Sequence, residues 1–169
     1  RLLRLVNQLL DLSKLDSGTL PINLVEGSLY KCLRSAASAF SSHAAQRNLD
    51  FQIRIPAETL WAAFDRDKME EVVYNLLSNA FKFTPDSGTI LISANHKDGL
   101  LNIEVSDTGK GIPSRDQLNI FDRFYQVDDS ATKSSEGSGI GLSLVKEFVD
   151  LMKGEITLES KLNKGTSFY

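Results

Sequence analysis

The stretch NLLSNAFKFT, residues 75–84, places polar side chains inside an apolar helical pattern. Asn75, Asn79 and Lys82 lie within about 60° of each other on a helical wheel, and Glu71 extends the same stripe by one turn. Asparagine is a mediocre helix former and is costly to bury unpaired. Two amide oxygens beside an ammonium group can hold a hard cation and a polyanion together, and magnesium prefers oxygen ligands shared with phosphates. A solvated polar face accounts for the same stripe, and these ten residues do not separate the two interpretations.

The apolar side of this helix and the segments around it predict the fold class. Met69, Val72, Val73, Leu76 and Ala80 form an apolar face, and Asp65 or Asp67 can cap the N-terminus. The remaining patterns predict helices over residues 1–16, 28–48 and 140–152, short helical pieces over 114–126, and strands at 22–25, 49–55, 61–64, 89–95, 100–106, 155–159 and 166–169. Asp98-Gly99 indicates a hairpin turn. We therefore predict an α+β fold, a two-layer α/β sandwich whose mixed, mostly antiparallel sheet is covered by helices on one face.

A second motif, DTGKGIP, spans residues 107–113 and follows a predicted strand directly. Gly109 and Gly111 allow a tight turn and a close approach of the backbone to a ligand. Asp107 at the strand end is a pure acceptor when ionised, which suits an exocyclic amine such as that of adenine. An ordinary turn that follows a strand and contains an Asx residue is the alternative.

A third motif, EGSGIGLSLV, spans residues 136–145 and opens an apolar helix. Gly137, Gly139 and Gly141 precede that helix, and backbone amides at a helix N-terminus bind phosphate well. The Rossmann fingerprint is excluded because Leu142 occupies the position of its third glycine, and the chain contains no Walker-type phosphate loop. A flexible hinge before a helix is the alternative, although three glycines at alternate positions are unusual in a hinge.

Composition excludes several other classes of protein. With 169 residues, 41% hydrophobic and 24% charged, the chain has the composition of an ordinary globular domain. A net charge of −3 does not favour a nucleic-acid partner. The single cysteine, Cys32, cannot form an internal disulfide, His43 and His96 are isolated, and no apolar run reaches the length of a transmembrane helix. The helical pattern begins at residue 1, with about two heptads, so we expect the stub of a longer dimerisation helix and a chain cut from a larger protein.

Five motifs in order make the chain resemble the catalytic, ATP-binding domain of sensor histidine kinases, in the superfamily of gyrase, Hsp90 and MutL. NLLSNAFKFTP resembles the N box of this family. DTGKGIP, GSGIGLSLV and KGTSFY resemble its three glycine boxes, and IFDRFYQ (residues 120–126) resembles its phenylalanine box. LLRLVNQLLDLSKLDSG resembles the end of the second helix of the dimerisation and phosphotransfer domain. The resemblance implies the Bergerat ATP-binding fold over residues 19–169, an ATP lid at about 127–138, and the end of the dimerisation helix over residues 1–18.

The resemblance also implies roles for individual residues. Asn79, helped by Asn75, would coordinate Mg²⁺, Lys82 would pair with phosphate oxygens, and Asp107 would hydrogen-bond the adenine amine. Arg123 would approach the phosphates, and Phe121 and Phe124 would anchor the lid. The full set implied for ATP is Asn75, Asn79, Lys82, Phe83, Asp107, Gly109, Gly111, Ile112, Phe121, Gly137, Gly139, Gly141, Leu142 and Thr166. Many members carry an arginine where this chain has Gln126. The resemblance therefore does not imply a cationic contact from this position to the γ-phosphate.

The implied reaction moves the γ-phosphoryl group of ATP to a histidine of the dimerisation domain and then to a receiver domain of a response regulator. Implied partners are ATP, the kinase's own dimerisation domain and the receiver, without nucleic acid or direct membrane contact. The implied location is the cytoplasm, as the cytoplasmic part of a membrane-anchored sensor kinase. The acceptor histidine is absent from this chain. Three alternatives stay open: an ATPase of the gyrase type, a serine or threonine kinase of the same superfamily, and a binding module with a decayed pocket.

Overall fold

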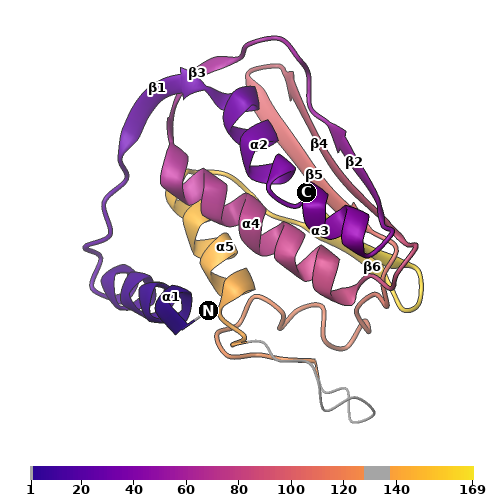
Figure 1. The fold of residues 1–169 in the computed structure, drawn as a ribbon. Coiled ribbons are helices and arrows are strands. Elements are labelled where there is room, and N and C mark those ends of the chain that lie inside the picture. The colour runs from indigo at the N-terminus through magenta and orange to yellow at the C-terminus, as the bar shows by residue number, and fades with distance from the viewer. Residues whose placement is uncertain (1, 128–137) are drawn as a thin grey trace.

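A five-stranded sheet covered by helices on one face forms the body of the molecule (Figure 1). The computed structural model describes residues 2–127 and 138–169. Within these ranges the strand order is β2-β4-β5-β7-β6, with β2 parallel to β4 and the other neighbours antiparallel. The strands are β2 (Asp50–Arg54), β4 (Thr89–Lys97), β5 (Leu100–Asp107), β6 (Leu158–Lys161) and β7 (Gly165–Phe168). This arrangement confirms the predicted two-layer sandwich with a mixed, mostly antiparallel sheet.

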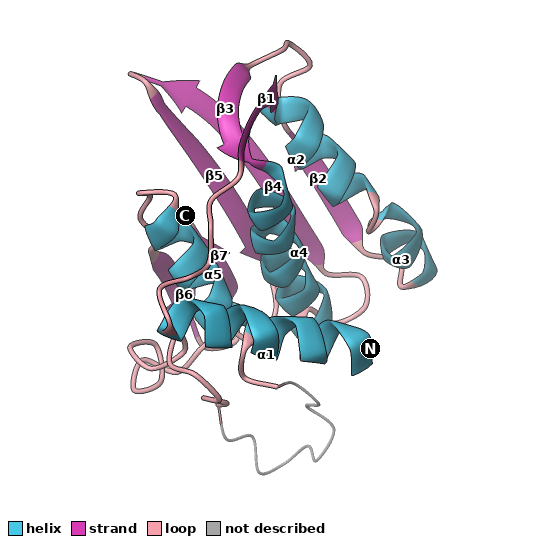
Figure 2. Ribbon diagram, turned by 90° about the vertical axis from the view of Figure 1, so that its left-hand side faces the viewer, coloured by secondary structure: helices cyan, strands magenta, loops and turns pink. Residues whose placement is uncertain are grey.

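The helical layer consists of α2 (Leu29–Ser38), α3 (Ser41–Gln46), α4 (Arg66–Phe83) and α5 (Gly141–Leu151). The first helix, α1 (Leu2–Asp16), lies against α5 (Figure 2). A separate two-stranded antiparallel ribbon, β1 (Leu24–Ser28) with β3 (Trp61–Asp65), leads into α2 and α4. The helix α4 lies centrally in this layer, in contact with both α2 and α5.

The core lies between the helical layer and the sheet. The helix α4 buries Val72, Val73, Leu76, Leu77, Ala80 and Phe81, which pack with buried residues of β4, β5 and α5. Burying one large apolar side chain contributes about 1.5–3 kcal/mol, so this face holds α4 in a defined rotation. Of the polar stripe, Glu71, Asn79 and Lys82 keep accessible surface, whereas Asn75 is buried.

Two of the predicted helical segments are wrong. The single helix expected over residues 28–48 is broken between α2 and α3, where the N–H of Phe40 bonds the carbonyl of Ala37. The Phe40 ring packs on Phe81, with centroids 5.1 Å apart. Arg47 then bonds the backbone carbonyls of Phe81 and Thr84 and so ties the end of α3 to the end of α4. The expected helical pieces over 114–126 are successive i→i+3 turns, which follow Pro113. The strands expected at 22–25 and 155–159 are shifted along the chain, because each shares only two residues with β1 and β6 respectively. The remaining elements differ from expectation only at their ends.

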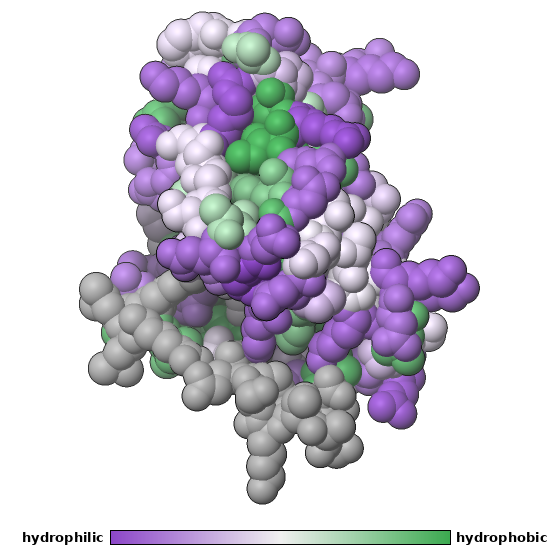
Figure 3. Space-filling model, turned by 45° about the vertical axis from the view of Figure 1, so that its right-hand side comes forward, coloured by the Kyte–Doolittle hydropathy of each residue, from purple (hydrophilic) through white to green (hydrophobic). Residues whose placement is uncertain are grey.

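Most of the surface seen in Figure 3 is hydrophilic, with one compact hydrophobic patch in its upper half. Cys32 is buried beside Glu70. Burial, and to a smaller extent the negative charge of Glu70, raise the pKa of its thiol to about 11. This burial agrees with a packing role for the cysteine. Among the helices in the described part of the chain, none combines the length and the apolar character needed to cross a membrane.

Asp65 caps the N-terminus of α4 and thereby supports the helix that carries the polar stripe. Its carboxylate accepts hydrogen bonds from the backbone N–H of Lys68 at 3.1 Å and of Asn23 at 2.8 Å, and it pairs with the Lys68 ammonium group at 2.9 Å. Burial alone would raise the pKa of this carboxyl group, but the hydrogen bonds from Lys68 and Asn23 together lower it below its ordinary value.

We expect Asp65→Asn to lose about 2–4 kcal/mol of unfolding free energy at neutral pH, because the Lys68 ammonium group loses its buried partner. The native pKa lies below the unfolded value of about 3.9, so this contribution is complete above that value and is lost as the pH falls through the native pKa. Urea unfolding from pH 7 downward checks the prediction. Asp67→Asn, an exposed charge change in the same helical turn, is the control and should cost less than about 0.5 kcal/mol. A cost for Asp65→Asn that does not shrink in acid would contradict the prediction.

Candidate functional site

The polar stripe of α4 forms one wall of a cleft of about 1280 Å³. Asn75, Asn79 and Lys82, which the helical wheel placed on one face, all line this cleft. Other lining residues come from the loop after β5, from β7 and from the segment that enters α5. Residues from four elements therefore meet in one concave site, which is the usual geometry of a small-molecule site.

Asn75 lies at the closed end of the cleft and is only 5% exposed. Its side-chain oxygen Oδ1 accepts a hydrogen bond from Nε2 of Gln8 on α1, at 3.4 Å. Gly141, the first residue of α5, passes so close that a Cβ there would lie 3.2 Å from the same oxygen. The glycine thus lets the start of α5 approach the polar stripe, and α1 reaches the same point from the other side.

Asp107 lines the cleft at the point where β5 ends. Its Oδ1 accepts a hydrogen bond from the backbone N–H of Gly109 at 2.7 Å, and β5 pairs it with Thr166 of β7. Burial raises the pKa of this carboxyl group, while the backbone N–H groups of Gly109 and Thr166 act in the opposite direction. The result is a carboxylate that is held in place, half-buried and directed to the cleft by fixed backbone donors.

The glycines of the DTGKGIP motif are required by close backbone contacts. A Cβ at Gly109 would lie 2.5 Å from the carbonyl oxygen of Phe83 at the end of α4. Gly111 has φ +67°, and a Cβ there would lie 2.1 Å from the carbonyl oxygen of Lys161 at the end of β6. The loop is therefore clamped between the end of α4 and the β6–β7 turn. The sequence predicted a close approach to a ligand at these glycines, whereas the close neighbours in the structure are backbone atoms of Phe83 and Lys161.

Two lysine side chains share the aromatic ring at the end of α4. The Nζ atom of Lys82 lies 4.7 Å from the centroid of the Phe83 ring, and Nζ of Lys110 lies 4.9 Å from it. Both residues line the cleft. Cation–π contacts of this length are weakly favourable and hold the two ammonium groups at the same end of the site.

The third glycine motif forms the remaining wall. Gly139, Gly141 and Leu142 line the cleft together with Ile112. Gly139 has φ +69°, and a Cβ there would lie 2.6 Å from the carbonyl carbon of Phe124, so only glycine fits. Gly137 and most of the predicted lid, residues 128–137, lie outside the described residues. The described ends of that segment, Val127 and Ser138, both border the cleft.

Three predicted site residues lie beside the cleft, among the described residues, and do not line it. Gly109 is buried behind Asp107. Phe121 packs edge-to-face on Phe168, with ring centroids 6.3 Å apart, so it supports a residue of the cleft wall. Arg123 pairs with Asp16 of α1 at 2.7 Å and with Glu147 of α5 at 3.3 Å, and this ion-pair network faces α1.

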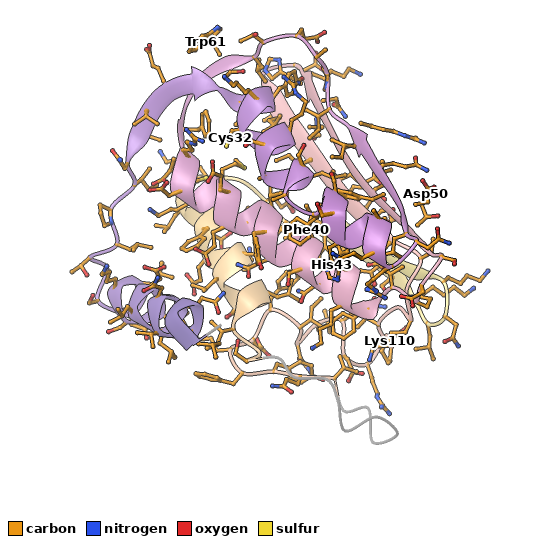
Figure 4. The ribbon with its side chains drawn as sticks, viewed as in Figure 1. Cys32, Phe40, His43, Asp50, Trp61 and Lys110 are labelled. Carbon is orange, nitrogen blue, oxygen red and sulfur yellow. The ribbon has the colours of Figure 1, made fainter. Side chains whose placement is uncertain are left out.

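Several residues of the site were not predicted from the sequence. Lys110, Tyr125 and Gln8 line the cleft, and His43 stacks on Phe81 at one side of it, with ring centroids 5.3 Å apart. Gly165 has φ +104°, and a Cβ there would lie 1.8 Å from the carbonyl oxygen of Asp107. Figure 4 places Phe40 and His43 beside α4 and Lys110 on the loop at the C-terminal end of α4. The glycine of the KGTSFY motif was a usable signal for Gly165, whereas the others depend on contacts between distant segments.

This constellation suits a ligand that carries both a polyanion and a hydrogen-bond donor. Lys82 on α4 and Lys110 on the β5 loop provide positive charge, and Asp107 at the end of β5 provides an acceptor. Within residues 2–127 and 138–169, no group of three or more His, Cys, Asp or Glu side chains could hold a metal ion. The two asparagine amides fit a hard cation only if the ligand itself supplies further oxygens, which is how Mg²⁺ is usually bound beside phosphates.

A family model described as "Histidine kinase-, DNA gyrase B-, and HSP90-like ATPase" matches residues 64–169, which include the whole of α4 and every motif of the cleft. The chain belongs to this ATPase family. The relatives and the solved structure described below are histidine kinases, so the chain is similar to a histidine kinase catalytic domain.

Two relatives illustrate the similarity. Hybrid signal transduction histidine kinase D of Dictyostelium discoideum is 44% identical over 172 residues, covering 99% of this chain and 11% of the relative. Sensor histidine kinase WalK of Bacillus subtilis is 37% identical over 169 residues, covering 99% of this chain and 28% of the relative. The chain therefore spans well under a third of either of these relatives.

Solved structures of the ATPase family agree with the fold. Full-length ShkA, in complex with AMPPNP, superposes with a TM-score of 0.82 at 27% identity, covering 99% of this chain and 34% of ShkA. The catalytic domain of histidine kinase ThkA superposes with a TM-score of 0.73 at 26% identity, covering 86% of this chain and 92% of that domain.

Proposed function

We propose that this chain binds Mg-ATP in the cleft between α4 and the β5 loop. We propose further that it transfers the γ-phosphoryl group to a histidine of a dimerisation domain, for relay to a receiver aspartate. One observation supports the proposal: Asn75, Asn79 and Lys82 of α4 line the same cleft as Asp107 at the end of β5. The complex of ShkA with AMPPNP, an ATP analogue, supports the same ligand class for this chain.

Each wall would recognise a different part of ATP. Asp107, as a fixed acceptor, would bind the exocyclic amine of adenine, with Thr166, Ile112 and Phe83 shaping the base pocket. Lys82 would pair with phosphate oxygens, and the amides at the start of α5, near Gly139 and Gly141, would add backbone donors.

In phosphoryl transfer, such a domain contributes mainly by positioning the ATP and neutralising its charge, and little by covalent chemistry. Asn79, with Asn75, would hold Mg²⁺ through amide oxygens, and the bound ion would offset charge on the phosphates. Asn75 cannot accept a proton from water as a carboxylate would, so we expect slow hydrolysis of ATP when no histidine acceptor is present. Arg123 would reach the phosphates only after leaving Asp16 and Glu147.

The remaining parts of the proposal concern partners. The helix α1 would be the C-terminal end of the dimerisation and phosphotransfer helix, with residues 19–169 as the catalytic domain. Val6, Leu9 and Leu10 are 44–53% exposed on α1, while Leu12 and Gln8 are buried against the domain. An exposed apolar stripe of this kind fits a second helix of a dimer. The kinase would act in the cytoplasm, as the cytoplasmic part of a sensor.

A chimera tests the reaction. We expect this chain to support labelling from γ-labelled ATP when it replaces the matching region of Dictyostelium hybrid histidine kinase D. The label should be acid-labile, and the same chimera with Asn79→Ala should incorporate little of it. The isolated chain should remain unlabelled. Acid-stable label on serine, stoichiometric label on the isolated chain, or a well-folded chimera that incorporates none would contradict the proposed function.

A further inference from the structure

One face of α1 carries contacts that hold this helix against the rest of the chain. Gln8, Leu12 and Asp16 are spaced four residues apart, so they follow one stripe of the helix. Gln8 and Leu12 are each only 5% exposed, whereas Asp16, the last residue of α1, is exposed. The two polar residues therefore lie about 12 Å apart along the helix axis, with a buried leucine between them.

Each end of this stripe contacts a residue to which the proposed function gives a role in binding Mg-ATP. At one end, Nε2 of Gln8 donates to Oδ1 of Asn75 at 3.4 Å. At the other end, the carboxylate of Asp16 pairs with the guanidinium group of Arg123 at 2.7 Å. The docked helix thus engages, at the same time, an amide proposed to bind the metal and a cation proposed to reach the phosphates.

The space around Oδ1 of Asn75 is limited. Asn75 and Gln8 are both 5% exposed, and a Cβ at Gly141 would lie 3.2 Å from this oxygen. Magnesium binds oxygen ligands at about 2.0–2.1 Å and keeps several waters. A hydrated ion at Oδ1 would need the space that the Gln8 side chain fills, and its charge would repel the N–H group that points at the same oxygen. Gln8 and the ion therefore compete for one oxygen.

We propose that Gln8 couples α1 to the metal site, so that docking of α1 through Gln8 and binding of Mg²⁺ at Asn75 exclude each other. This inference rests on the proposed function. Binding of Mg-ATP then releases α1 from the cleft, and the same movement separates Asp16 from Arg123 and frees the guanidinium group for the phosphates. Conversely, docking of α1 lowers the affinity for Mg-ATP, because only molecules with α1 released bind it fully.

Calorimetric titration of this chain with Mg-ATP, and with ATP in EDTA, tests the coupling. We expect Mg-ATP to bind about threefold more tightly to Asp16→Asn, whose ion pair is largely exposed, and up to about tenfold more tightly to Gln8→Ala. Gln8→Ala should gain little in EDTA, because the competition concerns the metal. Asn7→Ala and Asp11→Asn are the matched controls on the same helix. Neither Asn7 nor Asp11 lines the cleft, so both variants should bind as wild type does.

A pair of spin labels measures the movement itself. Ser13 on α1 and Glu159 on β6 are exposed, so cysteines at these two positions can carry the labels. The native Cys32 is buried and should not react. We expect one narrow distance distribution without nucleotide and a longer or broader one with Mg-ATP. A distribution that saturating Mg-ATP leaves unchanged would overturn the inference.

The outcomes separate this inference from the proposed function. If neither wild type nor any variant binds Mg-ATP, the proposed function fails, and the inference fails with it. If wild type binds Mg-ATP and Gln8→Ala binds it no more tightly than Asn7→Ala does, only the inference is overturned. A gain of equal size with and without Mg²⁺ would also overturn it, because Gln8 would then not act on the metal site. Thermal unfolding of each variant establishes that the affinities refer to folded protein.

Discussion

We expect the Asp107→Asn variant to bind adenine nucleotides about 10–100-fold more weakly than wild type, with little change in stability. The Asp107 carboxylate accepts from the backbone N–H of Gly109 at 2.7 Å, and the backbone N–H of Thr166 also points at it. An amide of the same shape replaces one acceptor oxygen with a donor, so one N–H group or the adenine amine loses its partner. Hydrogen bonds to a charged group contribute about 1.5–3 kcal/mol, which corresponds to this range of affinity.

The pH dependence provides a second readout of the same residue. Burial raises the pKa of Asp107, so its carboxylate takes up a proton at a higher pH than an exposed aspartate would. Nucleotide affinity in the wild type should therefore fall as the pH drops through this raised pKa, and the fall should be smaller in Asp107→Asn. Isothermal titration calorimetry between pH 4 and pH 8 measures both effects.

The Asn79→Ala variant, on α4, is to be compared with Asp107→Asn. Loss of the Asn79 amide should mainly reduce the difference in affinity between titrations with and without Mg²⁺, because its amide oxygen would bind the metal beside the phosphates. Asp107→Asn should keep that difference while losing overall affinity. If both variants bind as wild type does, the nucleotide site lies elsewhere.

Gly111→Ala is expected to destabilise the fold by on the order of 4 kcal/mol or more, a value reserved for severe steric or strain effects. The backbone at Gly111 has φ +67°, and an added Cβ would lie 2.1 Å from the carbonyl oxygen of Lys161. Either the β5 loop or the β6–β7 turn must move, and the strand pairing that places Thr166 beside Asp107 moves with it.

Gly18→Ala separates the two causes of that loss. Gly18 has φ +64°, almost the same conformation, but a Cβ there would have no neighbour within 4 Å. Its substitution should cost only the left-handed backbone penalty, about 1–2 kcal/mol. Urea unfolding of both variants measures the difference. Similar losses in the two variants would mean that the close approach to Lys161 is not rigid.

The helix α4 was predictable because the sequence signals that specify it lie within or directly beside the helix. Apolar spacing fixes which face is buried, and Asp65 provides a capping signal that the structure confirms through the N–H of Lys68. The same spacing then places Asn75, Asn79 and Lys82 together without reference to any other element. Asp107 and its glycines were predictable for a similar reason, since a strand end followed by two glycines is a local pattern.

Contacts between distant segments were not predictable in this way. Gln8 reaches Asn75 across 67 residues, and Arg123 reaches Asp16 across 107. Gly165 meets Asp107 only because β7 pairs with β5 in one register. Arg123 shows the consequence: its motif implies a phosphate contact, whereas in the described arrangement its charge is engaged by α1 and α5.

Backbone amide chemical shifts during titration with Mg-ATP test the location of the site most directly. We predict that the largest changes fall on Gly111, Gly139, Gly141 and Asn79, which line the cleft, and on Gly109, which bonds Asp107. A second cavity of about 420 Å³ lies between α4, α5 and β5, lined by Met69, Leu101 and Met152 among others. Shifts that cluster at that cavity, with the glycine loops unchanged, would contradict the account.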